Sequence, residues 1–356
     1  MEIRSLTLLL ATFSLAAQES PYCKSDCNQK SSLFSYFPEG IPPGVNDTRD
    51  ATTTYINASY ILWTARQEGM AIAASNATIN PPISTDSAIQ GEIVYPSWKL
   101  TSGFKAAIGT YLGHDGWDLG LQFIWFASRH NNYSSLTKGA LFPTWLLGTF
   151  LTDVNTAQSR WNNFFYRLDG KIARDFYLGR TLTVKPFIGL IGAIEKQWFD
   201  IAYTYNVNPL VSLAITDKNR QKWWGFGPYL GSNNSFICYE RGMSQYSIFL
   251  NSGVALAWGN YKTAYDLESE TPLLPPTDLF INIKNSYWNL TPLLELALGI
   301  RLETCHTLCD KWSSLLQVAW ESELWFAHNQ MALLNRMHDG NNYSMQGLTV
   351  TAQVSF

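Results

Sequence analysis

The last ten residues of the chain alternate between apolar and polar side chains, and this pattern limits what the chain can fold into. One face of this segment carries Leu348, Val350, Ala352, Val354 and Phe356, and the other carries Gly347, Thr349, Thr351, Gln353 and Ser355. Successive side chains of a β-strand point to opposite faces. A strand of a membrane barrel needs about 9–11 residues with every second one apolar. The segment therefore predicts a barrel strand.

The same alternation recurs along the chain and predicts the fold class. It is found at residues 53–65, 69–75, 98–108, 117–125, 164–172, 182–194, 223–230, 248–258, 292–300 and 314–320. It is weakest at 53–65 and 69–75. With the C-terminal strand these segments make eleven, and single-chain bacterial barrels usually have an even number. We therefore expect an all-β, transmembrane, antiparallel up-and-down β-barrel of about twelve strands, with ten as the second choice and the miscount in the first 100 residues.

The N-terminus predicts export. Arg4 precedes an apolar run at residues 6–17, which ends in the small residues Ala16 and Ala17. This order is typical of a signal peptide, and the run is too short to span a membrane. We expect a signal peptide at 1–17, a periplasmic segment at 18–51 and an outer-membrane barrel at 52–356.

Composition excludes other classes of protein. Charged residues make up 15% of the chain and aromatic residues 14%, and the mean hydropathy is −0.09. A typical soluble domain has about 25% charged residues. No stretch after the signal peptide approaches 18 apolar residues, so helical membrane spans are not expected. The net charge of −3 argues against nucleic acid as a partner.

The links between the predicted strands differ in length. Those near residues 113–116 and 177–180 are short, whereas 130–160, 199–222, 262–289 and 327–343 are long and polar. Outer-membrane barrels have short periplasmic turns and longer outer loops. The long links should therefore lie outside the cell, where aromatic residues such as Trp145 could fold inward or stick outward.

Three stretches carry a resemblance to a known family. They are Gly116-Trp117-Asp118-Leu119 within the 98–126 hairpin, the hairpin from Tyr166-Arg167-Leu168-Asp169 through Lys185-Pro186-Phe187-Ile188, and Trp224-Gly225-Phe226-Gly227-Pro228 followed by 248–258. Over most of residues 55–356 the chain resembles the pore-forming major-outer-membrane-protein-like family of Legionella and chlamydia-related bacteria. The resemblance implies a porin-like barrel in the outer membrane, without catalytic residues. The alternating final strand also resembles the assembly signal of outer-membrane barrels.

Charged residues occupy the polar phase of the predicted strands. They are Lys105, Arg167, Asp169, Lys171, Lys185, Glu195, Glu295, Arg301, Glu321 and Glu323. A Lys or Arg facing lipid near the midplane costs roughly 2–4 kcal/mol, so these side chains should face the lumen. They would line a water-filled pore, or pair across strands and hold the wall together, and both can hold. Their mixed signs predict no ion preference.

The cysteines and histidines fall outside the strong strand patterns. Cys23 and Cys27 precede the barrel, whereas Cys238, Cys305 and Cys309 fall in links on the periplasmic side. The periplasm is oxidising, so disulfides are expected, and the odd count leaves one thiol for an intermolecular bond. Free thiols, or a metal bound by Cys305, His306 and Cys309, are the alternatives. A second ligand pair is missing for the metal. His114, His130, His328 and His338 are expected to be solvated loop residues.

Two functions remain open at this point. The first is a porin-like barrel for passive diffusion of small hydrophilic solutes or ions, with no enzymatic activity, cofactor or metal. The second is a structural or adhesive surface barrel with an occluded lumen, cross-linked into the envelope by disulfides. The expected partners are outer-membrane lipid, the barrel-assembly machinery through the final strand, and disulfide-linked envelope proteins or a second copy of the chain.

Overall fold

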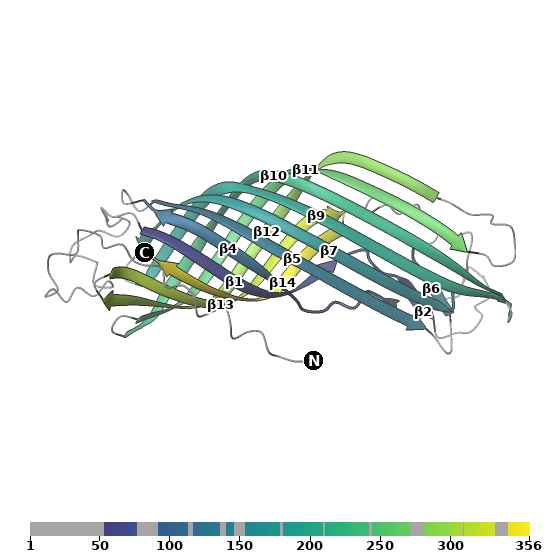
Figure 1. The fold of residues 1–356 in the computed structure, drawn as a ribbon, viewed down its shortest axis with the longest axis horizontal. Helices are drawn as coiled ribbons and strands as arrows, with labels where there is room; N and C mark the ends of the chain where they lie inside the picture. Colours follow the sequence, from purple (N-terminus) through teal and green to yellow (C-terminus); the bar gives the residue numbers. More distant parts are fainter. Residues whose placement is uncertain are drawn as a thin grey trace.

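The computed structural model describes residues 53–76, 92–112, 117–135, 140–145, 154–178, 181–208, 211–241, 244–270, 281–308, 310–331 and 341–356. The predicted signal peptide and the 18–51 segment lie outside these ranges. In the described ranges, no helix is both long and apolar enough to cross a membrane. Figure 1 shows the described strands running obliquely around one elongated barrel, with the C-terminus at its left-hand end.

The barrel has ten strands in the described part of the chain, each antiparallel to its neighbours. They are β1 (Thr53–Gln67), β4 (Thr101–Tyr111), β5 (Trp117–Ser135), β7 (Thr156–Arg174), β9 (Leu182–Asn208), β10 (Val211–Arg241), β11 (Ser244–Glu270), β12 (Ile281–Leu308), β13 (Asp310–Asn329) and β14 (Asn341–Ser355). A short β8 (Phe176–Leu178) pairs with the start of β9. The pairing of β14 with β1 closes the sheet. Closure satisfies the backbone hydrogen bonds that lipid cannot.

The all-β barrel is confirmed, and its strand number is the second choice, ten, not twelve. The surplus segment is 69–75. The chain turns at Gly69, whose φ is +78°, and then forms β2 (Ala73–Asn76). This strand pairs with β3 (Ile93–Val94) and β6 (Ala140–Pro143) in a separate three-stranded sheet.

The small sheet lies within the outer part of the barrel. Met70 and Ile72 are fully buried, and the Tyr203 hydroxyl in β9 donates a hydrogen bond to the Ile72 carbonyl at 2.6 Å. Trp145, which follows β6, packs edge-on against Phe199 of β9 at 5.2 Å between ring centroids. This aromatic residue of a predicted outer loop therefore folds inward, and the sheet fills the outer end of the barrel.

Two of the expected outer loops are mostly strand. The expectation for 199–222 was wrong, because β9 continues to Asn208 and β10 begins at Val211, with these two residues paired. In the 262–289 link, strand covers all but residues 271–280, which lie outside the described ranges. β10 has 31 residues, whereas about 9–11 suffice to cross the membrane. These strands therefore extend well beyond the lipid.

In this extension the same residues of the alternation still face inward, but the polarity of the two faces changes. Ile201, Tyr203 and Ile215 face inward and are buried, while Asp200 and Lys218 face outward. Within the membrane the outer face is apolar, but in water it must be polar and the interior apolar. In the sequence, the extension therefore lacks the outward apolar residues of a membrane strand and resembles a polar loop.

Aromatic residues bound the apolar outer surface at both ends. Exposed side chains toward the short links include Tyr239, Tyr246, Trp312 and Phe356, and those toward the long links include Trp224, Trp258, Trp288 and Phe326. On β11, Tyr246 and Trp258 are about 12 residues apart, which at about 3.3 Å per residue and a tilt of about 40° spans roughly 30 Å. This fits an apolar band of about 25 Å with its flanking girdles. Because outer-membrane barrels have short periplasmic turns and longer outer loops, we assign the end that carries the short links and the C-terminus to the periplasm.

The final strand closes the barrel with its predicted phase. Leu348 and Val354 point outward, and the terminal Phe356 is 60% exposed. The backbone of Phe356 exchanges two hydrogen bonds of 2.9 Å with Thr54, just before the β1–β14 pairs. The role of the strand in assembly remains a prediction.

Candidate functional site in the barrel interior

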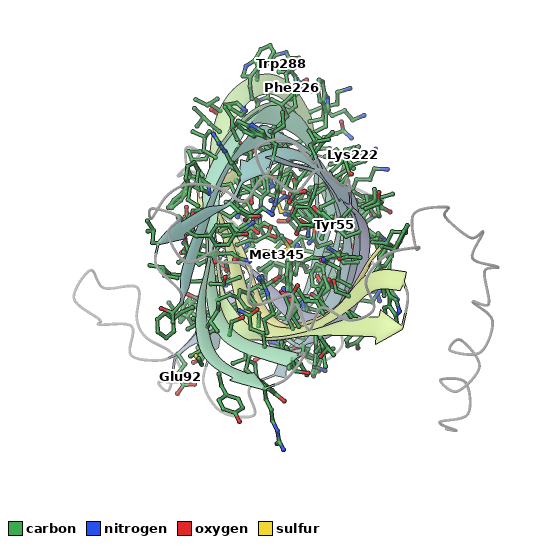
Figure 2. The ribbon with its side chains drawn as sticks, turned by 90° about the vertical axis from the view of Figure 1, so that its left-hand side faces the viewer. Tyr55, Glu92, Lys222, Phe226, Trp288 and Met345 are labelled. Carbon is green, nitrogen blue, oxygen red and sulfur yellow. The ribbon has the colours of Figure 1, made fainter. Side chains whose placement is uncertain are left out.

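The charged residues of the polar phase lie in the barrel interior. Contacts between strands that are not neighbours require this placement. Lys105 in β4 reaches Glu321 in β13 at 2.6 Å, although β14 and β1 stand between those strands. Figure 2 shows the interior filled with side chains, with Tyr55 and Met345 pointing inward and Phe226, Trp288 and Lys222 pointing away.

A middle layer of charge is centred on Arg167 of β7. Its Nε donates to Asp169 Oδ1 at 2.8 Å, and its Nη2 donates to Glu295 Oε2 at 2.7 Å across the lumen. Its Nη1 lies 3.0 Å from Glu323 Oε1, an ion pair that is not aligned as a hydrogen bond. The Tyr229 hydroxyl donates to Glu295 Oε2 at 2.8 Å. The Arg167 side chain has 0% exposure, so this layer excludes water at its centre.

The arrangement of carboxylates explains why the arginine is there. Glu295 and Glu323 are directly opposite each other on β12 and β13. Like charges at such positions repel, and Arg167 contacts both from the opposite wall. The Lys171 ammonium lies above the Tyr229 ring, 4.8 Å from its centroid. Lys105, Arg167 and Lys171 thus face Asp169, Glu295, Glu321 and Glu323, three cations against four carboxylates.

A second charged layer lies toward the periplasmic end. Lys185 Nζ is 2.7 Å from Asp118 Oδ2 and 3.6 Å from Asp175 Oδ1. The Tyr55 hydroxyl donates to Asp118 Oδ1 at 3.1 Å. Arg301 donates to Gln317 Oε1 at 3.5 Å. Lys185 and Arg301 are therefore tied to polar partners on other strands. The predicted pairing of charges across the strands is present at both heights.

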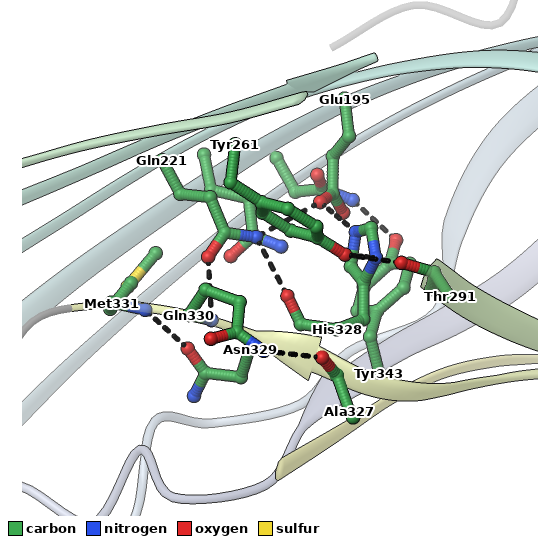
Figure 3. Close-up of polar contacts among 12 residues, drawn as sticks. Glu195, Gln221, Tyr261, Thr291, Ala327, His328, Asn329, Gln330, Met331 and Tyr343 are labelled. Carbon is green, nitrogen blue, oxygen red and sulfur yellow. Dashed lines mark hydrogen bonds and ion pairs between the residues drawn. The ribbon is translucent and has the colours of Figure 1, made fainter. Parts of the chain in front are cut away.

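An upper polar cluster is built on His328 of β13 and Glu195 of β9 (Figure 3). His328 Nε2 lies 2.5 Å from Glu195 Oε2, and both side chains have 0% exposure. Tyr261 bonds to His328 Nδ1 at 2.9 Å and to Thr291 at 2.7 Å. Gln221 donates from Nε2 to the His328 carbonyl at 3.0 Å. The cluster links opposite walls of the barrel above the Arg167 layer.

His328 reaches the interior because the strand alternation breaks at Ala327. The inward residues of β13 are odd-numbered up to Trp325, so residue 328 should point outward. Ala327 adopts φ +50°, and the register of β13 against β14 shifts between Trp325 and Asn329. A left-handed alanine is strained unless the surroundings hold it. Sequence phase alone could not have placed His328, and its assignment as a solvated loop residue was wrong.

His130 is also buried, which contradicts the same assignment. Its Nδ1 accepts a hydrogen bond from the Lys99 backbone N–H at 3.2 Å, and its ring stacks on Trp161 at 5.4 Å and 16°. It lies on β5 beyond the outer girdle, and burial lowers its pKa. His114 and His338 lie outside the described residues.

Four tryptophans are buried in the interior, two of them against His328 of the upper cluster and one, Trp63, beside Lys105. Trp63, Trp161, Trp223 and Trp325 are each at most 1% exposed, and Trp223 meets Trp325 at 5.4 Å and His328 at 4.7 Å between ring centroids. The Trp223 ring lies flat on the wall, because a Cβ at Gly225 or Gly259 would come within 2.6 or 2.5 Å of it. The two glycines are thus the sequence signal for this ring position.

The strand number makes such filling expected. Eight strands leave room only for packed side chains, and 16–18 leave an open aqueous channel. A ten-stranded barrel is close to the first case. Charged layers, the tryptophan layer and the small outer sheet follow one another along the axis.

Of the five cysteines, the structure describes the side chain of Cys238 alone. Cys238 lies at the periplasmic end of β10, exposed and with a free thiol. Cys23, Cys27 and Cys309 are outside the described residues, and the side chains of Cys305 and His306 are not described. In the described ranges no cluster of three or more His, Cys, Asp or Glu could hold a metal ion. Disulfide formation by these cysteines stays a prediction.

Comparison with known proteins identifies the family. The family described as Legionella pneumophila major outer membrane protein precursor matches residues 55–356. The chain belongs to this family. The predicted resemblance is therefore confirmed, and the protein is located in the bacterial outer membrane. No curated protein matches the chain.

Solved outer-membrane barrels are only distantly similar to this family member. The outer membrane protease OmpT of Escherichia coli is 11% identical, with 89% of this chain and 99% of that chain covered and a TM-score of 0.38. The toluene transporter TodX of Pseudomonas putida is 8% identical, with coverages of 86% and 89% and a TM-score of 0.21. A FadL homologue of Pseudomonas aeruginosa is 8% identical, with coverages of 86% and 90% and a TM-score of 0.19.

Proposed function

We propose that the protein is an outer-membrane channel for small hydrophilic solutes or ions, closed by its interior layers in the described conformation. The Arg167 layer is the observation that carries this proposal. Its side chains come from β4, β7, β10, β12 and β13, so they form a polar constriction across the lumen.

The contrast between the two halves of the barrel supports a channel. Beyond the membrane the buried interior combines apolar side chains such as Phe199 and Ile201 with mostly uncharged polar ones such as Asn219, and Asp217 is a buried carboxyl there. Within the membrane the same chain places cations and carboxylates, although burying ion pairs is often no better than burying apolar residues. A polar lining is what water and ions need once the constriction moves.

The second candidate is a structural or adhesive surface barrel whose lumen never opens. The complete burial of Trp161, Trp223 and Trp325 favours it. On either proposal the protein is not an enzyme: we assign the His328–Glu195 pair a structural role, because neither side chain is exposed to a substrate. Envelope cross-linking through the cysteines belongs to the second candidate.

Planar-bilayer recording on refolded protein separates the two. The wild-type channel should show small, infrequent openings, because three layers must rearrange. Arg167→Ala removes the centre of the charged layer and should raise the size or frequency of openings. Heat-modifiable gel mobility verifies that each variant is a folded barrel. Folded wild type and variant that both stay silent would favour the structural barrel.

A further inference from the structure

Three lysines form a row on the outer surface of the barrel. Lys222 of β10 is directly opposite Lys196 of β9 on one side and Lys262 of β11 on the other. All three are exposed, and Figure 2 shows Lys222 pointing away from the barrel. Cβ atoms of directly opposite residues are about 4.5–5.5 Å apart, and like charges there repel.

The neighbouring carboxylates do not neutralise this row. Asp200 pairs with Arg220 at 2.5 Å, and Glu268 pairs with Lys218 at 2.7 Å, and both carboxylates lie four or more residues farther along their strands from the membrane. Among the described residues no carboxylate forms an ion pair with Lys196, Lys222 or Lys262. The row is thus a concentrated positive charge of three.

An aromatic surface lies directly below the row. Trp224 and Trp258 meet Trp288 at 5.3 and 4.4 Å, and Phe226 meets Trp258 at 6.1 Å between ring centroids. All four rings are between 44% and 52% exposed. They form the outer girdle of β10, β11 and β12, so the lysines stand at the height of the lipid headgroups in the outer leaflet.

We propose that Lys196, Lys222 and Lys262 bind the phosphate of a phosphorylated lipid headgroup in the outer leaflet. The charge is complementary, and each ammonium offers hydrogen bonds to phosphate oxygens. The acyl chains lie against Trp224, Trp258 and Trp288. This site is independent of whether the lumen conducts.

Lipid titration of the intact, refolded protein in neutral detergent tests the site, with bound lipid counted by native mass spectrometry. The probes are phosphatidic acid, phosphatidylcholine and inorganic phosphate. Phosphatidic acid should bind the wild type, and K222Q/K262Q should bind it about tenfold or more weakly. Phosphatidylcholine should bind both proteins alike.

The matched control is R66Q/K99Q, which removes two exposed charges, with Arg66 on β1 at the opposite side of the barrel. It should bind phosphatidic acid like the wild type. Equal loss in both double variants, or no loss in K222Q/K262Q, overturns the site. Inorganic phosphate competing as strongly as the lipid would overturn the lipid assignment. If K222Q/K262Q lacks heat-modifiable mobility, K222Q alone decides, with a smaller expected loss.

Discussion

Replacing Arg167 by Met should destabilise the barrel strongly, because it removes the shared partner of three carboxylates. Asp169, Glu295 and Glu323 lie 2.8, 2.7 and 3.0 Å from the guanidinium. Breaking a buried pair by removing one partner costs about 3–5 kcal/mol. Met retains most of the side-chain volume, so the loss reports on charge rather than on a cavity. Lys105 stays engaged with Glu321 and cannot replace the guanidinium.

Urea unfolding and refolding in detergent, followed by gel mobility, measures the loss as a shift of the midpoint. R66M, at an exposed site, serves as the control and should change stability by less than about 0.5 kcal/mol. Adding Glu323→Gln to R167M should restore part of the stability, because the Glu295–Glu323 repulsion disappears. A loss in R167M no larger than that in R66M, or no recovery in the double variant, would refute this account of the layer.

Three further predictions follow from other parts of the structure. Burial raises the pKa of the Asp217 carboxyl, in the extension beyond the membrane, well above its usual value. The folded state therefore holds this proton more tightly, and wild-type stability falls as pH rises above about 4 through the raised pKa. D217N should gain stability over the wild type across that window, and parallel pH curves for the two would contradict this. Changing Phe356 to Asp should block assembly but not secretion, checked by fractionating the envelope, and normal outer-membrane levels would exclude the terminal signal. Cysteine introduced at Lys171 or Glu321 in a cysteine-free background should make conductance sensitive to charged, membrane-impermeant thiol reagents. Cysteine at the exposed Leu190 or Leu296 should not, and equal responses would reverse the assigned faces.

Within the membrane, sequence phase predicted both faces of the wall. Leu190, Leu296 and Leu298 are exposed on the outside, and Arg167 and Glu323 are buried inside. The physical reason is that lipid penalises charge at every outward position, so the pattern is strict. Contacts across the lumen could not be predicted, because phase gives the direction of a side chain but not its partner on a distant strand.

The incorrect predictions fall in segments beyond the lipid, where a charge on the outer face carries no penalty. Residues 69–75 alternate over too short a length to distinguish a barrel strand from the small sheet. At Ala327 the left-handed backbone reverses the phase, and nothing in the alternation of the preceding residues marks it. Such a reversal is set by tertiary contacts, here the burial of His328 against Glu195.

The boundary of the membrane can nevertheless be recognised in the sequence by pairs of adjacent aromatic residues. Below it the outer residues are apolar and the inner ones largely polar, and above it the outer residues are polar while the inner ones include large apolar side chains such as Ile201 and Tyr203. At the exchange both faces are apolar, so two adjacent residues are aromatic, one inward and one outward. Such pairs are Trp125-Phe126, Phe164-Phe165, Trp198-Phe199, Trp223-Trp224, Tyr287-Trp288 and Trp325-Phe326. In Trp223-Trp224 the first ring is buried against His328 and the second is exposed in the outer girdle. An aromatic pair that interrupts alternation therefore indicates where a strand leaves the lipid. The polar residues beyond the pair are predicted correctly as strand only if polar side chains are expected on the outer face.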